Sequence, residues 1–583
     1  MKSYVADFET TTIETCDSET WVWSYGALQL FPESEKEKEM IKGTNIDDFM
    51  NWCSYSSKEI YFHNLKFDGM FILDWLLNNS FEYNEEKKAK ERTFKVVITK
   101  DGIFYQIEVY WKVRSKRIVK TTFKDSYKKL PFTVKRIAQA FKLEMGKGDI
   151  DYNAVRPRGY EPTPEEWDYL YKDVEIMRQA LEIQIGENLT KMTIGSDSLN
   201  TFKTLLAKSE NGQIKERKFR DVFPLLEKDL NDDIRRSYKG GFTYLNPIHA
   251  GVDIKQGQVY DVNSLYPAVM YYKDMPYGDP IRFEGKYEPS KRYPLYIQAL
   301  KCEFFLKKGY IPTIQIKGDY RFKATEYLTS SNGYHVELLL TNVDLELFFE
   351  HYDVIVHEWQ YYYQFKSVNG IFNEYIDKYM SIKKVETGAK RELAKLLLNN
   401  LYGKFASSTD ATGKIPELNE KTGLLKLKVD ENPKEKDSIY TPVGAFITAY
   451  AREITIRGAQ ALGGRFIYAD TDSLHIRGLE PVDLDIHATD LGKWKFEGEF
   501  LRGRFLRAKT YMEEIAQNDK GDCKISEMTH TKVKVVCAGM NDKIKQQITF
   551  DNFKKGNSFY GKLIPKIIKG GVVLKDDYFT LKL

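Results

Sequence analysis

The sequence has little cysteine, and the cysteines it has are isolated. They lie at positions 16, 53, 302, 523 and 537 of a 583-residue chain, and no two are spaced as Cys-x-x-Cys. An odd, scattered set of this kind argues against zinc and against a disulfide framework. It favours reduced thiols, as in a cytosol.

Long apolar runs, repeats and low-complexity segments are also missing. No segment approaches the roughly 20 apolar residues that a membrane-spanning helix needs. The chain reaches Asp7 and Glu9 at once, so its N-terminus lacks the pattern of a secretory signal. We therefore expect no membrane association. With 583 residues, of which 42% are hydrophobic, the chain should form several domains with real cores.

The net charge is only +4, so basic surfaces have to be sought locally. Residues 112–147 carry twelve Lys and Arg against Asp125 and Glu144, a net charge of +10, and residues 532–569 have a net charge of +7. Aromatic residues such as Phe123 are interleaved with both stretches. Cations mixed with aromatics suit a groove that follows phosphates and stacks bases. A plain solvated surface has the same composition.

Two aspartates separated by one residue give the first sign of chemistry. Asp470-Thr471-Asp472 has apolar residues on both sides, which predicts a strand, a tight turn and a second strand. Two negative charges this close repel by about 1 kcal/mol in water and by more where water is excluded. Hard oxygen ligands of this kind suit Mg²⁺ or Mn²⁺. An ordinary polar hairpin turn remains the simpler interpretation of this segment alone.

Two further segments strengthen the metal interpretation. Asp261 follows a strand-like lead and adds a carboxylate at a strand end. The run from Lys383 to Tyr402 predicts a helix that ends near Gly403. Its polar residues are spaced to share one face, namely Lys383, Arg391, Lys395, Asn399 and Tyr402. Carboxylates for two metals, cations for a triphosphate and an aromatic ring for a base together suit phosphoryl transfer.

The N-terminal third holds a second group of acids. Asp7 and Glu9 alternate along a strand-like run and should share a face. Asp68 begins a helix-like run, and Tyr169 and Asp173 lie one helical turn apart after a Pro-Glu-Glu helix start. Four acids from three elements can bind two Mg²⁺ and hydrolyse a phosphodiester. Each acid taken alone is more often a helix cap or a surface charge.

Three motifs resemble those of a known family. Asp261-x-x-Ser-Leu-Tyr-Pro, Lys395-x-x-x-Asn-x-x-Tyr-Gly and Tyr468-Ala-Asp-Thr-Asp-Ser are similar to motifs A, B and C of family B DNA polymerases. Runs such as Tyr238-Lys-Gly-Gly and Asn342-Val-Asp-Leu match the protein-primed branch, of the phi29 type from Bacillus phages. The resemblance spans residues 1–583. It implies a processive, strand-displacing, DNA-templated DNA polymerase with a proofreading 3′–5′ exonuclease, which replicates a linear phage-type genome.

The resemblance also implies roles for the polymerase residues. Two Mg²⁺ (or Mn²⁺) per active site would be held by Asp261, Asp472 and the Val262 carbonyl, with support from Asp470. The nucleotide would be bound by Lys383, Arg391, Lys395, Asn399, Tyr402 and Tyr266, the last acting as a steric gate against a 2′-hydroxyl. DNA would contact Tyr238, Gly240, Gly241, Thr448, Arg452, Lys509 and Tyr511. Two residues depart from the family pattern, since relatives commonly have Lys at Arg391 and often Cys at Ala469.

In the same way, the N-terminal acids resemble the Exo I, II and III motifs of DEDDy-type exonucleases. Asp7, Glu9, Asp68 and Asp173 would bind metal, and Tyr169 would orient the attacking water. Lys147 would contact the scissile phosphate, and Asp149 would hold a metal ion or its water. Contacts to the DNA strand would come from Tyr61, His63, Asn64, Phe71, Ser126, Tyr127, Lys147 and Tyr152.

The implied architecture is multidomain, with α/β and α+β parts. A ribonuclease-H-like exonuclease domain would be followed by a right-hand polymerase with two insertions. The limits would be exonuclease 1–195, palm 196–272 and 433–535, first insertion 273–370, fingers 371–407, second insertion 408–432 and thumb 536–583. The first insertion would contact the priming protein, and the second would be a β-hairpin for processivity and strand displacement.

The expected partners are template and primer DNA, dNTPs, a terminal (priming) protein and a single-strand DNA-binding protein. The chain would be a monomer in the cytoplasm of an infected bacterial host. Three alternatives fit less well. A DNA-primed family B polymerase would not need the two insertions, and a replication protein with decayed sites would not keep acids at every motif. An RNA-templated polymerase would not need the N-terminal acids.

Overall fold

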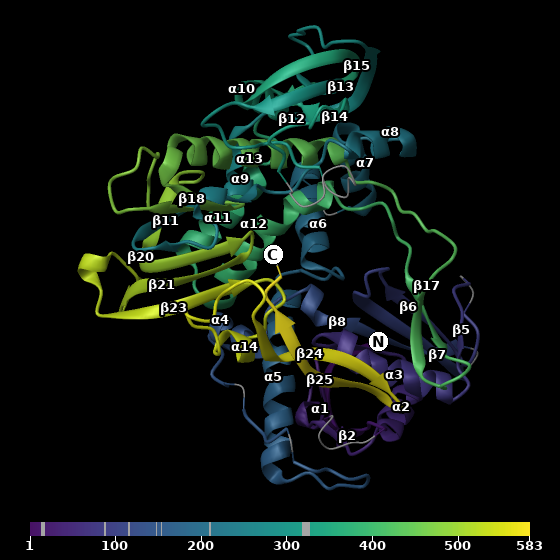
Figure 1. The fold of residues 1–583 in the computed structure, drawn as a ribbon. Helices are drawn as coiled ribbons and strands as arrows, with labels where there is room; N and C mark the ends of the chain where they lie inside the picture. Colours follow the sequence, from purple (N-terminus) through teal and green to yellow (C-terminus); the bar gives the residue numbers. More distant parts are fainter. Residues whose placement is uncertain are drawn as a thin grey trace.

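The chain folds into two lobes and a smaller sheet that caps the upper lobe (Figure 1). The lower lobe is a mixed α/β unit built from the N-terminal residues, and the upper lobe is built on an antiparallel sheet. In the part of the chain described below, no helix is both long and apolar enough to cross a membrane. The computed structural model describes residues 1–12, 18–86, 89–114, 117–146, 148–152, 154–208, 211–316 and 327–582.

The lower lobe is organised around a sheet of strand order β3-β2-β1-β4-β8-β7-β6-β5. β1 pairs with β4 in parallel, and β4 does so with β8. Val5 of β1 packs with the α5 layer, whereas Phe8 packs edge-on against Phe49 of α2 on the opposite face. Because side chains alternate along a strand, Asp7 and Glu9 point to the same side as Val5, toward α5.

The bounds of the lower-lobe elements show that the predicted strand at Asp7 and the predicted helices at Asp68 and Tyr169 are present. Helix α5 begins with a capping box between Thr163 and Glu166, as its sequence indicates. The elements are β1 (Lys2–Thr10), β2 (Val22–Gln29), α1 (Glu35–Lys38), β3 (Ile41–Gly43), α2 (Ile46–Tyr55), β4 (Lys58–Phe62), α3 (Leu65–Asn78), β5 (Glu82–Tyr83), β6 (Thr93–Ile98), β7 (Phe104–Arg114), β8 (Arg117–Asp125), α4 (Val134–Phe141) and α5 (Pro164–Gly186).

The upper lobe contains an antiparallel sheet of order β22-β21-β20-β11-β19-β18-β9, with β10 against β20 and β23 against β21. β11 lies between β19 and β20, so Asp261 comes to stand opposite Ser473 at the start of β19. Helix α13 packs on this sheet and is buried along most of its length. The predicted strand-turn-strand at Asp470 and Asp472 is confirmed by β18 and β19.

The upper-lobe sheet and its helices come from segments far apart in the sequence. They are α6 (Ile194–Ala207), α7 (Gly212–Val222), α8 (Lys228–Arg235), β9 (Thr243–Leu245), β10 (Asp253–Ile254), β11 (Gly257–Val262), α9 (Leu265–Tyr272), α13 (Thr441–Ala461), β18 (Phe466–Asp470), β19 (Ser473–Arg477), β20 (Trp494–Arg507), β21 (Thr510–Asn518), β22 (Gly521–Asp522) and β23 (His530–Cys537).

The prediction of one helix from Lys383 to Tyr402 is wrong. The segment forms an antiparallel pair, α11 (Asn373–Val385) and α12 (Gly388–Phe405), because Glu386 and Thr387 are extended and Gly388 has a φ of 60°. Lys383 therefore lies on a different helix from Arg391 and Lys395. Gly403 does not end the helix either, since α12 continues to Phe405.

The capping sheet has the strand order β12-β15-β13-β14 and carries α10 on one face. Figure 1 shows it above the α13 layer. Its own apolar core includes Cys302, Phe304, Leu338 and Phe348, so it is a structural unit beyond the central sheet. The elements are β12 (Met275–Glu284), β13 (Leu295–Leu306), β14 (Val336–Thr341), α10 (Asn342–His351) and β15 (Tyr352–Val368).

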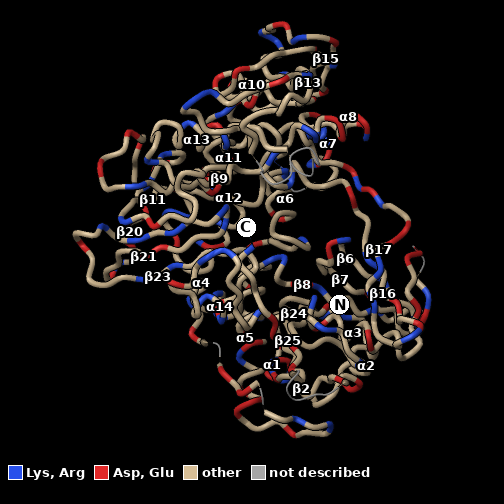
Figure 2. Tube along the Cα trace, in the orientation of Figure 1, with Lys and Arg blue, Asp and Glu red and all other residues tan. Residues whose placement is uncertain are grey.

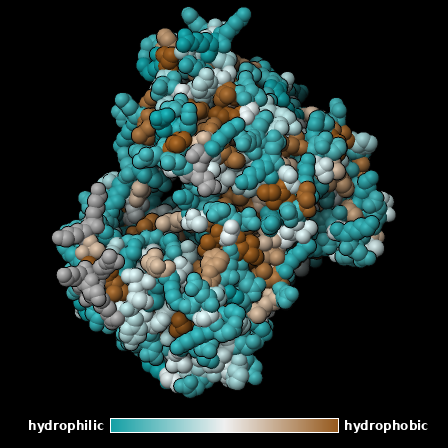
Figure 3. All heavy atoms as spheres, turned by 180° about the vertical axis from the view of Figure 1, so that it is seen from behind, coloured by the Kyte–Doolittle hydropathy of each residue, from teal (hydrophilic) through white to brown (hydrophobic). Residues whose placement is uncertain are grey.

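Two hairpins from later parts of the chain dock on the lower lobe. β16 (Lys414–Leu418) pairs with β17 (Leu425–Val429), and β24 (Ser558–Ile568) pairs with β25 (Gly571–Thr580), while the short α14 (Asp542–Lys545) packs on β24. Leu425 and Val572, one from each hairpin, belong to the same buried cluster as Phe49. Between the lobes, the surface seen from behind is hollowed (Figure 3).

Candidate active sites

The first site lies where β11 meets the β18–β19 turn. Thr471 has a φ of 63°, which makes the turn tight and leaves Asp470 and Asp472 on its two sides. The Val262 N–H donates to the Asp472 carbonyl oxygen at 2.8 Å, so the backbone of β11 is tied to this turn. Asp261 and Asp472 are thereby brought together from positions more than 200 residues apart in the sequence.

The electrostatics of this site favour a bound cation. Burial and then the charge of Asp472 raise the pKa of Asp261 to about 7. Burial also raises the pKa of Asp472, with a further contribution from Asp470. Among the described residues, the buried Oδ1 atom of Asp261 has no hydrogen-bond partner. Unpaired carboxylate oxygens that repel one another fit hard divalent cations such as Mg²⁺.

Asp470 is in a different position from the other two acids, because protein groups already contact it. The Thr243 hydroxyl donates to its Oδ1 atom at 3.1 Å and the Tyr468 hydroxyl to its Oδ2 atom at 3.2 Å. The ammonium group of Lys509 lies 3.8 Å from Oδ1. This arrangement fits a supporting role better than a direct ligand role.

The basic residues expected to bind a triphosphate meet from two helices. Lys383 of α11 donates to the Ser264 hydroxyl at 2.7 Å, just after the β11 strand. Burial lowers the pKa of Lys383, and the charges of Lys395 and Arg391 lower it further, so the three cations are close neighbours. Lys395 and Arg391 contact Glu392 at 2.8 and 3.3 Å. The three cations therefore still lie close together, although they come from two helices instead of one.

Two tyrosines stack beside these cations. The rings of Tyr266 on α9 and Tyr402 on α12 have centroids 3.7 Å apart and planes inclined by only 16°. Tyr266 sits in the first turn of α9, five residues after Asp261. The pair therefore forms a flat aromatic wall next to the carboxylates.

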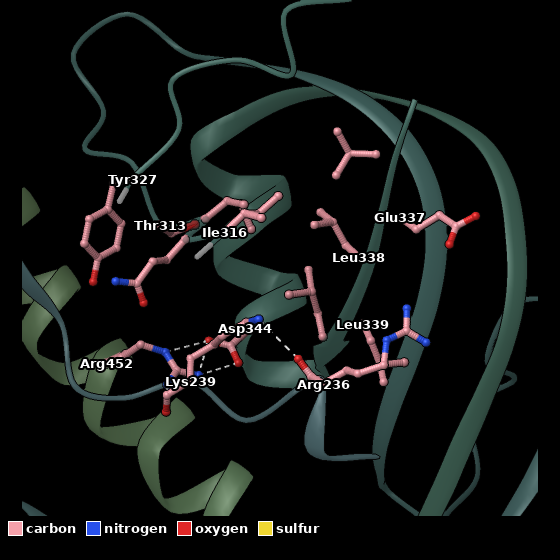
Figure 4. Close-up of a pocket in the computed structure, with 14 residues that line it drawn as sticks. Arg236, Lys239, Thr313, Ile316, Tyr327, Glu337, Leu338, Leu339, Asp344 and Arg452 are labelled. Carbon is pink, nitrogen blue, oxygen red and sulfur yellow. Dashed lines mark hydrogen bonds and ion pairs between the residues drawn. The ribbon is translucent and has the colours of Figure 1, made fainter. Parts of the chain in front are cut away.

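Arg452, predicted to contact the primer, is buried in an ion pair (Figure 4). Its guanidinium donates to both carboxylate oxygens of Asp344 on α10, at 2.7 to 3.1 Å. It also donates to the carbonyls of Lys239 and Gly240, at 2.8 and 2.9 Å. Arg452, Asp344 and Lys239 line a cavity of about 290 Å³ between the capping sheet and α13. Arg452 thus holds the Tyr238–Gly241 loop in place.

The loop that Arg452 holds lies directly against the turn between β18 and β19. A Cβ atom on Gly241 would come within 2.8 Å of the Thr471 hydroxyl, so only glycine fits there without a shift. The Thr471 N–H donates to the Phe242 carbonyl at 2.7 Å. Thr448 and Tyr511, also predicted to contact DNA, are 1% and 7% exposed and pack within the protein. Lys509, at the β20–β21 turn, has an exposed ammonium group.

The second site lies in the lower lobe, between β1, α3 and α5. Burial and then the charge of Asp7 raise the pKa of Asp68 well above its usual value. Burial and then the charge of Glu9 raise the pKa of Tyr169. The structure therefore brings Asp7, Glu9, Asp68 and Tyr169 together as predicted from their separate segments, and Asp173, one turn after Tyr169, is buried at the same helix face.

In the same lobe, residues predicted to contact DNA meet in two groups, one around His63 and one at Tyr152. His63 contacts the Ser126 hydroxyl at 3.0 Å and the Phe132 carbonyl at 2.7 Å, and its ring lies 5.5 Å from that of Tyr127. The hydroxyls of Tyr152 and Tyr169 are 2.6 Å apart. Asp125, whose role the sequence did not reveal, accepts the Asn64 N–H at 3.0 Å and thereby fixes the start of α3.

Two other residues predicted to contact DNA at this site, Phe71 and Tyr61, are buried. Phe71 is 1% exposed, and a Cβ atom on Gly571 would lie 2.6 Å from its ring, so it supports the β25 hairpin instead of facing DNA. Tyr61 is 6% exposed, with its hydroxyl 3.1 Å from Glu59. The carboxylate of Asp149 is exposed, whereas Lys147 lies outside the described residues.

Basic residues recur along parts of both lobes. Figure 2 shows Lys and Arg repeated along the β16–β17 hairpin and along the strands of the central sheet near β20 and β23. Within the predicted basic stretch, Lys532 and Lys534 of β23 are exposed. Exposed cations of this kind are suited to hold a polyanion.

Comparisons with known proteins agree with this geometry. The family model described as "DNA polymerase type B, organellar and viral" matches residues 50–163 and 156–491. The DNA polymerase of Bacillus phage phi29 is 47% identical over 100% of this chain and 99% of its own length. That of Streptococcus phage Cp-1 is 35% identical over 99% of this chain and 98% of its own length.

The solved structures lead to the same family. The phi29 DNA polymerase complexed with primer-template DNA and incoming nucleotides superposes with a TM-score of 0.92, at 45% identity over 100% of both chains. The same enzyme complexed with single-stranded DNA has a TM-score of 0.91, at 44% identity over 100% of both chains. The chain therefore belongs to the organellar and viral type B DNA polymerases, within the group of phi29-like enzymes.

Proposed function

We propose that this polymerase extends DNA primers at the Asp261–Asp472 site and removes mispaired 3′ ends at the Asp7–Glu9 site. The convergence of Asp261 and Asp472 beside Lys383, Arg391 and Lys395 is the observation that carries the proposal. Two bound Mg²⁺ or Mn²⁺ ions would supply Lewis acidity and lower the pKa of the attacking hydroxyl. Asp261, Asp472 and the Val262 carbonyl would hold them.

In extension, the protein positions the nucleotide and neutralises its charge. Lys383 would release Ser264 and, with Lys395 and Arg391, would contact the phosphates. Arg391 offers a planar fork of donors where a lysine offers a point charge, so its contacts would differ from those of a lysine. Tyr402 would move from Tyr266 to stack near the new base pair, leaving Tyr266 beneath the sugar. Asn399, exposed on the same helix, would border the nucleotide.

In proofreading, Asp7, Glu9, Asp68 and Asp173 would hold the metal ions that bind the scissile phosphate. The Tyr169 hydroxyl, already 2.6 Å from that of Tyr152, would orient water. His63, Asn64 and Tyr127 would contact the single strand. Asp149, whose neighbour Gly148 lies against the Tyr169 ring, would hold a metal ion or its water. Tyr238, Gly240 and Gly241 would guide the 3′ end between the two sites.

We propose the division into domains that the resemblance implies, although helix α6 crosses its limit at residue 195 and strand β23 crosses its limit at residue 535. The capping sheet falls within 273–370, the α11–α12 pair within 371–407 and the β16–β17 hairpin within 408–432. We assign to them contact with a terminal priming protein, nucleotide binding and processivity, in that order. Template, primer, dNTPs and a single-strand DNA-binding protein would complete the reaction, with the enzyme a monomer in the cytoplasm of an infected bacterial host.

The first prediction concerns Asp261 and metal. A carboxyl whose pKa is raised by folding destabilises the folded state at high pH; this effect is absent below pH 3.8 and complete above about pH 7. In EDTA, Asp261→Asn should therefore raise the free energy of unfolding at pH 8, by about 1.4 kcal/mol per pKa unit removed, and leave it unchanged below pH 3.8. Urea unfolding at both pH values measures this effect.

The same variant should no longer extend a primer in Mg²⁺. Exposed Asp519→Asn is the matched control and should retain both stability and extension. Near-normal extension by Asp261→Asn would show that the metal assignment is wrong, whatever the unfolding result.

The second prediction separates the two sites. Asp7→Ala combined with Glu9→Ala should reduce digestion of a labelled single-stranded oligonucleotide by about 10³-fold, the scale of losing metal-based charge stabilisation. Primer extension should persist, because the polymerase acids lie in the other lobe. Exposed Glu82→Gln in the same lobe is the control. Unchanged digestion in the double variant would exclude this site as the exonuclease.

The third prediction tests Tyr266 as the sugar gate. Tyr266→Val removes the ring that would block a 2′-hydroxyl, so the ratio of ribonucleotide to deoxyribonucleotide incorporation should rise about tenfold or more. Tyr266→Phe keeps the ring and should keep the selectivity. Single-nucleotide incorporation kinetics measure both ratios. Equal selectivity in Tyr266→Val and the unaltered enzyme would assign the gate to another residue.

The fourth prediction concerns the β16–β17 hairpin. Its base is closed by a bond from the Asp430 N–H to the Gly413 carbonyl at 2.9 Å, so residues 414–429 can be replaced by two glycines without straining the ends. Products made in the presence of a DNA trap should shorten, while addition of one nucleotide continues. Lys421→Gln at the hairpin tip is the control. Unchanged product length would make the hairpin a purely structural insertion.

A further inference from the structure

Two histidines and a glutamate gather on the outer face of the capping sheet, far in sequence from both acid sites. Glu303 lies on the central strand β13, His335 precedes β14 and His357 lies on β15. The neighbours of Glu303 in sequence, Cys302 and Phe304, belong to the core on the other face of the sheet. Side-chain exposures of 21%, 51% and 31% leave the three groups open to solvent.

The strand register explains why the three side chains meet. β13 and β14 pair Cys302 with Val336, so Glu303 and His335, each one residue farther, lie side by side on the opposite face. On β15 the register shifts, since Lys301 pairs with Glu358 and Cys302 with Val356. His357 is the extra residue in this bulge. A bulge redirects a side chain, and this one turns His357 toward Glu303.

The geometry is that of a preformed ligand set. The Nε2 atoms of His335 and His357 lie 3.1 and 2.9 Å from the same atom, Glu303 Oε1, and all three ligand atoms are within 4.8 Å of one another. Zinc bonds of about 2.0–2.2 Å in a tetrahedron place ligand atoms about 3.4 Å apart. Half-exposed side chains need to open by only a few tenths of an ångström to reach that spacing.

The two rings stack and present both Nε2 atoms to the same carboxylate oxygen. The imidazole centroids are 3.9 Å apart and the rings are inclined by 27°. With no metal ion, both Nε2 atoms must carry protons and donate to one oxygen. A metal ion instead accepts the lone pairs of two neutral imidazoles and the charge of the carboxylate. It satisfies all three groups at once.

We propose that Glu303, His335 and His357 form a binding site for one transition-metal ion of the zinc class, with water completing the coordination. Two nitrogen ligands and one oxygen suit Zn²⁺ and disfavour Mg²⁺, which prefers oxygen ligands only. The ion joins three adjacent strands of the capping sheet across its outer face. We assign the ion a structural role, because it would connect adjoining strands of a sheet that otherwise depends on strand pairing and one apolar core.

The test is zinc titration of the full chain by isothermal calorimetry, with excess Mg²⁺ to occupy the acid sites and a phosphine reductant to keep thiols reduced. The unaltered protein should bind one more Zn²⁺ than the His335→Gln, His357→Gln double variant. Glu303→Gln should weaken that extra site at least tenfold. Exposed His530→Gln is the control and should leave the isotherm unchanged.

Thermal unfolding gives a second, independent measurement. Zn²⁺ should raise the melting temperature of the unaltered protein and of His530→Gln, but not that of the double variant, because an ion that binds only the folded state stabilises it. Equal melting temperatures without zinc would show that the variants fold. Identical zinc isotherms for the unaltered protein and the double variant would overturn the proposal and leave the cluster as hydrogen bonds alone.

Discussion

The repulsion between Asp261 and Asp472 is the constraint on which the polymerase lobe depends. Folding buries these carboxylates and brings them together, and burial followed by the charge of Asp472 raises the pKa of Asp261 to about 7. The surrounding structure opposes this repulsion with rigid backbone: β11 is paired on both edges and bonded through Val262 to the catalytic turn. The acid cluster of the lower lobe follows the same principle, since burial and the charge of Asp7 raise the pKa of Asp68, and the two acids are held by β1 and α3.

The groups around the polymerase acids are held by contacts between distant segments. Arg452 of α13 connects Asp344 of the capping sheet with the loop against Thr471. The position of the catalytic turn is therefore coupled to the unit proposed to receive the priming protein. Lys383, through Ser264, provides a similar connection from the α11–α12 pair to β11. Three parts of the upper lobe thus meet at one turn.

The sequence predicted those features that short segments determine. The Asp470–Asp472 turn, the strand of Asp7 and the start of α5 each follow from a few neighbouring residues. It did not predict the break between α11 and α12, which one glycine and two extended residues produce. Nor did it predict the burial of Phe71, which a strand hundreds of residues later covers. The pairing of Arg452 with Asp344 was also missed, because the two residues lie about a hundred positions apart. Nothing in the sequence indicated the Glu303–His335–His357 cluster, because its three residues come from separate segments that only the strand register brings together.

The docking of Leu425 and Val572 in the core around Phe49 has a consequence for how the protein is made. A ribosome exposes residues one after another, so the lower lobe emerges first while two pieces of its apolar interior are still untranslated. Until Val572 appears, near the end of the chain, Phe71 lacks the strand that covers it. During synthesis, the lower lobe therefore keeps apolar surface exposed, and open to chaperones, until β25 has been translated and can cover it.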